Sequence, residues 1–408
     1  MPTSAPPFSN DVSLFILEDV GIVFSEAAQE IYELNTTATW IWCQLEDDQP
    51  LEGLPAALAQ TFGFAEAAAR RHLSETLEAW RDLGFLESGD SKALRKPAAA
   101  KRRKRHPRSR LPQSLLLSLR QRLAGSGAWE IRTYRSLGGE TVVVYPTEAT
   151  MALVDPAIAH LAQSRRVLAP QSLIEIEPQG DIFDVKRDGT TAYRDVAPEE
   201  LTPIVQYLVH ATGIERSDYR VALHAGAVAC GERVVVLPGS AGSGKTTLTA
   251  ALLSEGFRFL SDDLLLMGED LKIEGVPFAL GIKDSGVAPL LPYYPELPSL
   301  TLHHRRDGKK LRYLSAPIMP RVSRQSPLRL AAAWVIFPKY RPDCTTALKP
   351  LPKSQALRRL MESSTLALPL TRKQIETFIR WLEALDCYDL QVNALADAVA
   401  AVKKTVMS

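Results

Sequence analysis

One stretch decides the fold of this chain, residues 223–248, which read LHAGAVACGERVVVLPGSAGSGKTTL. Its second half has the spacing G-x4-G-K-T, which begins at Gly239 and ends at Thr246. An apolar run at 234–237 before this loop is typical of a strand, and residues 246–253 after it have a helical pattern. Strand, glycine-rich loop and helix form the setting that a phosphate-binding loop requires. The sequence therefore predicts an α/β domain that binds a nucleoside triphosphate.

The loop residues suit a polyphosphate. Glycines allow a tight turn that points consecutive backbone N–H groups at phosphate oxygens, next to a helix N-terminus. Lys245 supplies a positive charge for the terminal phosphates, and Thr246 supplies a hydroxyl ligand for magnesium. A Gly/Ser-rich surface loop could match by chance, but both flanks disfavour that alternative. The predicted cofactors are ATP and Mg²⁺, and the predicted nucleotide-binding residues are Gly239, Ser240, Ala241, Gly242, Ser243, Gly244, Lys245, Thr246 and Thr247.

Length and composition indicate a folded protein of two or three domains, because 408 residues exceed one ordinary core and 46% of them are apolar. The four cysteines lie far apart with no paired spacing, which argues against a zinc site or a disulfide framework and favours a cytoplasmic protein. The sequence shows neither a signal-peptide pattern nor an apolar run of membrane-spanning length, so we expect no export and no membrane span.

Residues 92–110 carry ten basic residues and no acidic one, in a segment that also holds two prolines and an alanine run. Such a block cannot bury apolar area, so a flexible basic linker is predicted at 91–112. Contact with nucleic acid or with an acidic peptide is the alternative. Nucleic acid is disfavoured as a partner because no Phe, Tyr or Trp is interleaved with the charges.

Before the linker, residues 11–90 are typical of a small α+β domain. Three short apolar runs predict strands at 14–17, 21–24 and 30–34. Helical spacing follows at 38–45, 51–61 and 65–83. Gly84 comes directly after the last of these patterns and is a candidate helix cap.

This region resembles the PqqD-type peptide-binding domain. The resemblance is carried by FSEA at 24–27, IYELN at 31–35, TATWIW at 37–42 and a helix that ends in DLGFL at 82–86. Members of that family are winged-helix-like modules that recognise ribosomally made, modified peptides. The resemblance implies a leader peptide as partner, added as an extra strand beside the third strand. It places four residues near the groove, although Ile31 and Leu77 are better explained as core residues: Ile31, Glu33, Arg70 and Leu77.

A second strand is predicted at 257–260, and it ends in Ser261-Asp262-Asp263. With the helix between the two strands, this predicts a right-handed βαβ unit with parallel strands. Ligands of such sheets bind at the carboxyl ends of the strands, which places Asp262 and Asp263 beside the loop. Two carboxylates there can hold magnesium and accept the proton of an attacking hydroxyl. The alternative is a turn in which an aspartate only ends the strand or caps a helix.

His224, the glycine-rich loop and GFRFLSDD at 256–263 follow one another in the order of the HPr kinase family, which residues 221–270 resemble. The resemblance implies a P-loop kinase fold of the HPr kinase type, in which Asp262 is the base that acts on a hydroxyl. It implies Lys245 and His224 as further catalytic residues, and Thr246 and Asp263 as the metal ligands. A histidine in this position, taken alone, is more often a core residue than a catalyst.

Two departures separate the chain from HPr kinases. Thr247 stands where they usually have glutamate, and a PqqD-like module stands in place of their usual sensor domain. HPr itself is therefore not the expected substrate. The prediction is an ATP-dependent kinase for a serine or threonine of a peptide that residues 11–90 recruit. The alternatives are a nucleotide-gated peptide chaperone that serves a separate peptide-modifying enzyme, and a small-molecule kinase. Relatives of HPr kinase commonly form symmetric multimers, which implies a homo-oligomer.

Residues 113–408 are predicted to complete the kinase domain. Strand character is present at 129–145 and 173–193, and a helix is predicted at 198–212. Lys283, in a predicted turn at 278–285, could face phosphate. A predicted hairpin at 302–311 carries four cations that could steer ATP or an acidic peptide, although a solvated tip explains them equally well: Arg305, Arg306, Lys309 and Lys310. The last helical patterns predict packing elements at 354–362, 372–385 and 392–406.

Overall fold

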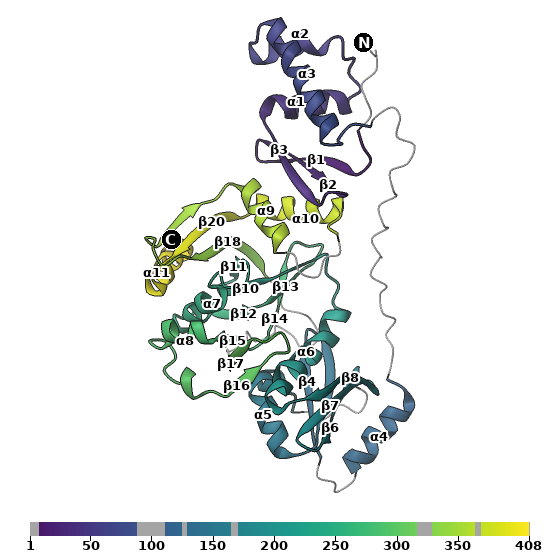
Figure 1. Ribbon diagram of the computed structural model, residues 1–408, viewed down its shortest axis with the longest axis vertical. Coiled ribbons are helices and arrows are strands. Elements are labelled where there is room, and N and C mark those ends of the chain that lie inside the picture. The colour runs from purple at the N-terminus through teal and green to yellow at the C-terminus, as the bar shows by residue number, and fades with distance from the viewer. Residues whose placement is uncertain are drawn as a thin grey trace. The chain divides into compact units, whose positions relative to one another are not determined.

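The computed structural model describes residues 8–87, 111–124, 129–164, 170–315, 329–363 and 369–407. Contacts within the chain divide it into two compact units, whose elements are labelled in Figure 1. Unit 1 comprises residues 1–103, 351–362 and 366–387, and unit 2 comprises residues 104–350, 363–365 and 388–408. The linker predicted at 91–112 lies outside the described residues except for its last two.

Unit 1 contains the strands and helices predicted before the linker, each within three residues of the expected bounds. The strands are β1 (Val12–Leu17), β2 (Val20–Ser25) and β3 (Glu30–Leu34), and the helices are α1 (Thr36–Glu46), α2 (Leu54–Phe62) and α3 (Glu66–Asp82). The strands form an antiparallel sheet in the order β1-β2-β3. The three helices form a layer on one face of this sheet (Figure 1).

Tryptophan side chains fill the core between the sheet and these helices. Trp42 of α1 and Trp80 of α3 are almost fully buried, and their ring centroids lie 5.1 Å apart in a T-shaped arrangement that suits the ring quadrupoles. α1 begins at a side-chain cap, because Asn35 Oδ1 accepts a hydrogen bond of 2.8 Å from the Ala38 backbone N–H. α3 ends at Gly84, whose φ of 72° costs glycine little.

The other face of this sheet is covered as well. Alternation along the strands places Ile22, Phe24 and Ile31 on that face, and none of the three is more than 4% exposed. Two helices from the C-terminal part of the chain belong to unit 1, namely α9 (Lys353–Glu362) and α10 (Arg372–Glu383). They lie on this side of the sheet in Figure 1, and α10 contacts β1. The sheet is therefore the middle of three layers.

Polar contacts fix the start of α10 to the turn between β2 and β3. Gln29 Nε2 donates to the Leu370 carbonyl at 3.0 Å, and the Leu370 N–H donates back to Gln29 Oε1 at 2.5 Å. The Arg372 N–H donates to Glu26 Oε1 at 2.6 Å, at a helix end that favours negative charge. The helices predicted at 354–362 and 372–385 within the 113–408 domain thus exist, but they pack on the N-terminal sheet, which offers them a second apolar face.

Because α9 and α10 cover this face of the sheet, we expect the effect of a substitution on stability to depend on how deeply the residue is buried. Ile22→Val deletes one methyl group from a fully buried position, so we expect unfolding free energy to fall by about 1 kcal/mol. Ile16→Val, on the neighbouring strand at a residue 47% exposed, is the matched control and is expected to change it by less than about 0.5 kcal/mol. Urea unfolding of the full chain measures both. Equal effects of the two substitutions would show that the second face is not packed.

Unit 2 begins with a five-stranded sheet that confirms the strand character predicted at 129–145 and 173–193. Its strands are β4 (Glu130–Ser136), β5 (Gly139–Tyr145), β6 (Ser172–Gln179), β7 (Ile182–Arg187) and β8 (Thr190–Val196), in sequence order across the sheet. Strands β5 and β6 are parallel, and the other neighbours are antiparallel. Helices α5 (Glu148–Ile158) and α6 (Pro198–Arg216) pack against it, and α6 confirms the helix predicted at 198–212. A further helix, α4 (Gln113–Ala124), precedes the sheet.

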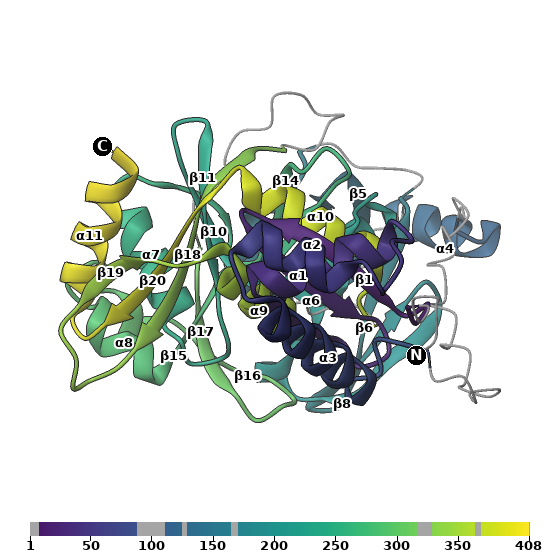
Figure 2. The same ribbon diagram turned by 90° about the horizontal axis from the view of Figure 1, so that it is seen from above.

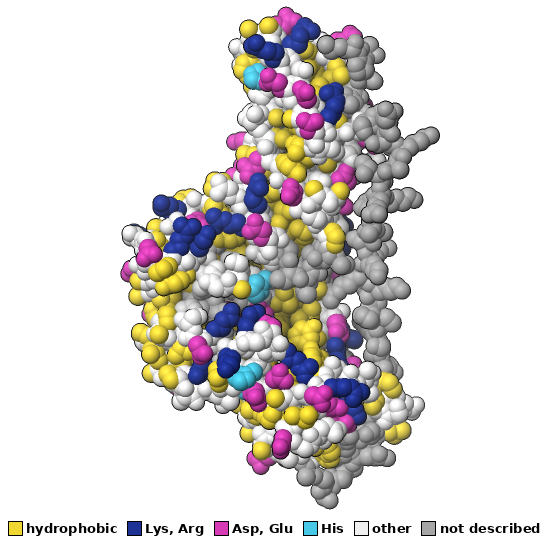
Figure 3. All heavy atoms as spheres, in the orientation of Figure 1, with side chains coloured by type: hydrophobic (Ala, Val, Ile, Leu, Met, Phe, Trp, Pro, Cys, Tyr) yellow, Lys and Arg dark blue, Asp and Glu magenta, His cyan; other side chains and the backbone are white. Residues whose placement is uncertain are grey.

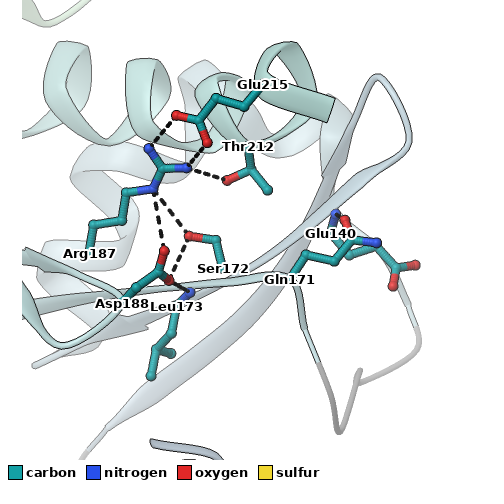
Figure 4. Close-up of polar contacts among 8 residues, drawn as sticks. All are labelled: Glu140, Gln171, Ser172, Leu173, Arg187, Asp188, Thr212 and Glu215. Atoms are coloured by element: carbon teal, nitrogen blue, oxygen red, sulfur yellow. Dashed lines mark hydrogen bonds and ion pairs between the residues drawn. The ribbon is translucent and has the colours of Figure 1, made fainter. Parts of the chain in front are cut away.

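Figure 4 shows the polar network that holds α6 to this sheet. Arg187 of β7 forms a two-pronged ion pair with Glu215 of α6, with N–O distances of 2.8 and 2.7 Å. Asp188 next to it accepts hydrogen bonds from Ser172 Oγ at 2.9 Å and from the Leu173 N–H at 2.8 Å. Bidentate Arg–carboxylate pairs fix orientation as well as distance, so α6 has a defined position on β6 and β7.

The central sheet of unit 2 positions the candidate site. Its strands are β10 (Ala225–Cys230), β11 (Arg233–Pro238), β12 (Arg258–Ser261), β18 (Ala331–Tyr340), β19 (Ala347–Pro350) and β20 (Asp386–Val392), in the order β12-β10-β11-β18-β20-β19. Helices α7 (Lys245–Ser254), α8 (Asp284–Leu290) and α11 (Leu395–Met407) lie on one side of it (Figure 2). Both β11 and β12 are antiparallel to β10, so they run parallel to each other as predicted, but β10 lies between them.

Two small antiparallel sheets complete unit 2. One has the order β14-β13-β9, from β9 (Val221–Leu223), β13 (Leu264–Met267) and β14 (Ile273–Val276). The other has the order β15-β17-β16, from β15 (Leu280–Lys283), β16 (Leu302–His304) and β17 (Lys310–Leu314). The hairpin predicted at 302–311 is confirmed. The turn predicted at 278–285 is wrong from Leu280 onward, because residues 280–283 pair with β17 as a strand and α8 begins at Asp284.

Candidate functional site

The glycine-rich loop, residues 239–244, connects β11 to α7. Gly242 and Gly244 have φ values of 85° and 96°, which side chains disfavour. A Cβ on Gly239 would lie 2.7 Å from Ser243 Oγ, so a larger residue here would require the Ser243 side chain to move. The Tyr340 N–H at the end of β18 donates to the Ser243 carbonyl at 3.2 Å and holds the loop to the sheet. The sequence spacing thus corresponds to a loop that only glycine at these positions can form.

Lys245 is the first residue of α7, and its side chain is 6% exposed. Its ammonium group donates to the backbone carbonyls of Gly239 at 2.5 Å and Ser240 at 3.1 Å. Burial lowers the pKa of Lys245, while the charges of Asp262 and Asp263 oppose that change. A buried cation is therefore held over the loop, at the N-terminal end of a helix that also favours anions.

Asp262 follows β12 and is 7% exposed. Burial raises its pKa to about 7, and the neighbouring charge of Asp263 adds to the rise, while Thr246, Lys245 and His224 act against it. Its Oδ1 atom is buried without a hydrogen-bond partner in the described part of the chain. Gly226 on β10 lies beside this carboxyl, and a Cβ there would lie 2.6 Å from Thr249 Oγ1 and 3.8 Å from Asp262 Oδ1, so the close packing here favours glycine.

Asp263 has the opposite electrostatic character. Burial raises its pKa, but the hydrogen bond and charge of His224, with the charges of Arg305 and Lys245, more than offset this and lower it. His224 Nδ1 lies 2.9 Å from both the side-chain Oδ1 and the backbone carbonyl of Asp263, so Nδ1 carries the ring proton. The His224 backbone N–H donates to the Ser363 carbonyl at 2.8 Å. No pattern in the sequence pointed to Ser363, because a backbone carbonyl leaves no residue-type signature.

The two adjacent aspartates are thus suited to different tasks. A carboxyl whose pKa lies near 7 can take up a proton at neutral pH, and an ionised neighbour can hold a cation. Thr246 and Asp263 offer the hard oxygen donors that magnesium prefers. The described residues hold no group of three or more His, Cys, Asp or Glu side chains arranged for a metal.

The structure brings together the residues that the sequence singled out along 39 positions, from His224 to Asp263. Lys245 and Thr246 begin α7, and the aspartate pair lies beside them. Among the four hairpin cations, Arg306 has a structural role. Its guanidinium donates to the Arg194 carbonyl at 2.5 Å, which holds it away from the candidate site. The charge of Arg305 helps to lower the pKa of Asp263, and the charge of Lys283 helps to lower the pKa of Lys245, so both cations act electrostatically on the site.

The two units have different architectures. Unit 1 has a small sheet between helical layers, and unit 2 is a mixed α/β unit in which a glycine-rich loop lies beside paired carboxylates. Residues 21–86 match the sequence profile of the family described as coenzyme PQQ synthesis protein D (PqqD). The N-terminal part of unit 1 is therefore a PqqD-like domain, as the sequence predicted. A comparison of the chain with curated proteins finds no match. Among the helices of the described segments, none has both the length and the apolar character needed to cross a membrane.

Proposed function

We propose that the chain is an ATP- and magnesium-dependent kinase, related to HPr kinases, that phosphorylates a serine or threonine of a peptide recruited by its PqqD-like domain. The observation that supports this most directly is the neighbouring pair Asp262 and Asp263, whose pKa values shift in opposite directions beside the buried Lys245. Pairs separated in this way identify acid/base and charge-holding roles in active sites.

The proposed reaction uses the residues of unit 2 in distinct roles. The amides of the glycine-rich loop and Lys245 bind and orient the phosphates. Thr246 and Asp263 would hold magnesium, which would supply neutralisation of the phosphate charge. The bond between the γ-phosphorus and the ADP oxygen breaks as a bond from the acceptor oxygen forms, and Asp262 takes the hydroxyl proton. His224 keeps Asp263 ionised and in place through its hydrogen bond.

Peptide recruitment is proposed to occur at the outer edge of β3. In the described sheet β3 pairs with β2 alone, so its other edge offers backbone groups to an added strand. Ile31 and Leu77 are 4% and 7% exposed, so they act as core residues, whereas Glu33 and Arg70 are accessible. A peptide held at β3 reaches the kinase site as a tethered substrate, at an effective concentration on the order of mM.

A nucleotide-gated peptide chaperone and a small-molecule kinase remain the alternatives. The raised pKa of Asp262 favours a kinase over a chaperone, because nucleotide binding alone gains nothing from a buried carboxyl whose Oδ1 atom has no hydrogen-bond partner among the described residues. The deciding experiment incubates the full chain with γ-labelled ATP, magnesium and precursor peptides that carry or lack their leader. Label on a Ser or Thr, with a KM at least about tenfold lower for the leader-bearing peptide, is expected. Retained nucleotide binding without any labelled peptide would favour the chaperone.

A further inference from the structure

The end of the sheet formed by β15, β17 and β16 lies at the start of α7. The strand register places Lys283, Leu311 and His303 side by side at this end, and Arg305 follows directly after β16. Helix α8 begins here too, and a Cβ on Gly286 would lie 3.3 Å from Thr247 Oγ1. The sheet end that carries Lys283 and Arg305 is thus adjacent to the first turn of the loop helix. In Figure 3, basic, acidic and histidine side chains gather on the face of unit 2 over β10 and β12.

Arg305 has a fixed backbone and a side chain with a replaceable partner. Its N–H donates to the Lys309 carbonyl at 2.8 Å, and its carbonyl accepts from the Gly308 N–H at 2.9 Å, which closes the hairpin turn. Its guanidinium lies 3.1 Å from Asp307 Oδ2 and is 46% exposed. Lys309 Nζ contacts the same oxygen at 2.6 Å. Asp307 therefore keeps a cation when Arg305 turns away from it.

The adjacent cation on the hairpin does not have this freedom. The Arg306 guanidinium donates to the Arg194 carbonyl and lies over the Tyr193 ring, 5.6 Å from its centroid. Those contacts anchor the hairpin to β8. Because Arg306 holds the hairpin in place, Arg305 is presented at a defined position beside the site, and its charge acts on Asp263 and Tyr313.

We propose that Arg305 leaves Asp307 to Lys309 and contacts the oxygens of the transferring phosphoryl group, as an arginine supplied by the chain itself. This inference rests on the proposed kinase function. Lys245 supplies a single point charge beside the loop, whereas the equatorial phosphoryl oxygens carry charge that a planar guanidinium matches with two hydrogen bonds. Such an arginine stabilises the transition state more than bound ATP, so its removal lowers the transfer rate with little effect on nucleotide affinity.

The test measures the affinity of the full chain for MgADP alone and for MgADP with aluminium fluoride, which mimics the phosphoryl group in transfer. Wild type is expected to bind MgADP at least about 100-fold more tightly when fluoride and aluminium are present. Arg305→Ala is expected to lose at least about tenfold of that gain while its affinity for MgADP alone changes less than about threefold. Arg305→Lys is expected to recover part of it.

Lys310→Ala is the matched control, since it removes an exposed cation of the same hairpin, leaves Arg305, Asp307 and Lys309 in place, and is expected to keep the full gain. An Arg305→Ala variant that keeps the gain, or wild type that binds MgADP but shows no gain, overturns the inference. Wild type that does not bind MgADP at all overturns the proposed function instead. Thermal unfolding of each variant accompanies the measurements, and Arg305→Lys keeps the test decisive if Arg305→Ala is poorly folded.

Discussion

Asp262→Asn is expected to lower the rate of phosphoryl transfer by about 10²- to 10⁴-fold, which is the usual loss when a general base is removed. Asparagine keeps the shape of the side chain but cannot accept the hydroxyl proton. The affinity for MgATP is expected to change less than about threefold, because the loop amides and Lys245 bind the phosphates without this carboxyl. Single-turnover transfer to a leader-bearing peptide, together with equilibrium nucleotide binding, measures both quantities.

Asp263→Asn is the informative companion to this variant. Loss of the Asp263 carboxylate is expected to weaken magnesium binding, so added magnesium should restore part of the transfer rate of Asp263→Asn. Magnesium should not restore Asp262→Asn, since that variant lacks the proton acceptor. Transfer by Asp262→Asn at a rate close to wild type would remove Asp262 as the base, and rescue of both variants by magnesium would assign both aspartates to the metal.

The pH dependence of wild type follows from the same residue. The carboxylate form of Asp262 accepts the proton, and its pKa is raised to about 7 by burial. The transfer rate is therefore expected to increase with pH up to about 8 and then level off. Asp263 is not expected to shape this profile, because its pKa is lowered and it is ionised throughout.

The sequence predicted most of the candidate site because the site is local. A strand, a glycine-rich loop and a helix lie next to one another in the chain, and the helix connects directly to the strand that carries Asp262. The left-handed φ values of Gly242 and Gly244 follow from steric rules that the residue type already reveals. The spacing of loop and aspartates therefore carried enough information to place these residues in one region.

What the sequence did not reveal depends on partners far away in the chain. The amphipathic patterns of α9 and α10 show that each helix has an apolar face, but not that this face meets a sheet about 340 residues earlier, as the Gln29–Leu370 contact requires. Strand order is likewise set by tertiary pairing, which is why β10 between β11 and β12 was not anticipated. Arg305 and Arg306 are adjacent cations in the sequence, which does not distinguish them. Only their contacts show that Arg306 anchors the hairpin and that Arg305 has a side chain that can move.

The second large effect concerns stability and its dependence on pH. In the folded chain the pKa of Asp262 is about 7, compared with 3.8 in the absence of perturbation. Between those values the folded state binds a proton that the unfolded state has lost, so the stability of wild type falls as pH rises from about 4 to about 7. At about 1.4 kcal/mol per unit of pKa, this loss is slightly more than about 4 kcal/mol.

Asp262→Asn has no such titration, so it is expected to match wild type near pH 4 and to exceed its unfolding free energy by up to about 4 kcal/mol at pH 8. Urea unfolding of the full chain at a series of pH values measures the difference. Asp307→Asn is a control of opposite sign, because its hydrogen bond to Lys309 lowers the pKa of Asp307 and so stabilises the folded state only above the acidic range. If the unfolding free energies of wild type and Asp262→Asn change in parallel from pH 4 to pH 8, the pKa of Asp262 is not raised in the folded chain.

If they diverge as expected, Asp262→Asn is the less active protein and also the more stable one at neutral pH. That result is typical of an active site that gives up stability to keep a catalytic base near neutral pKa.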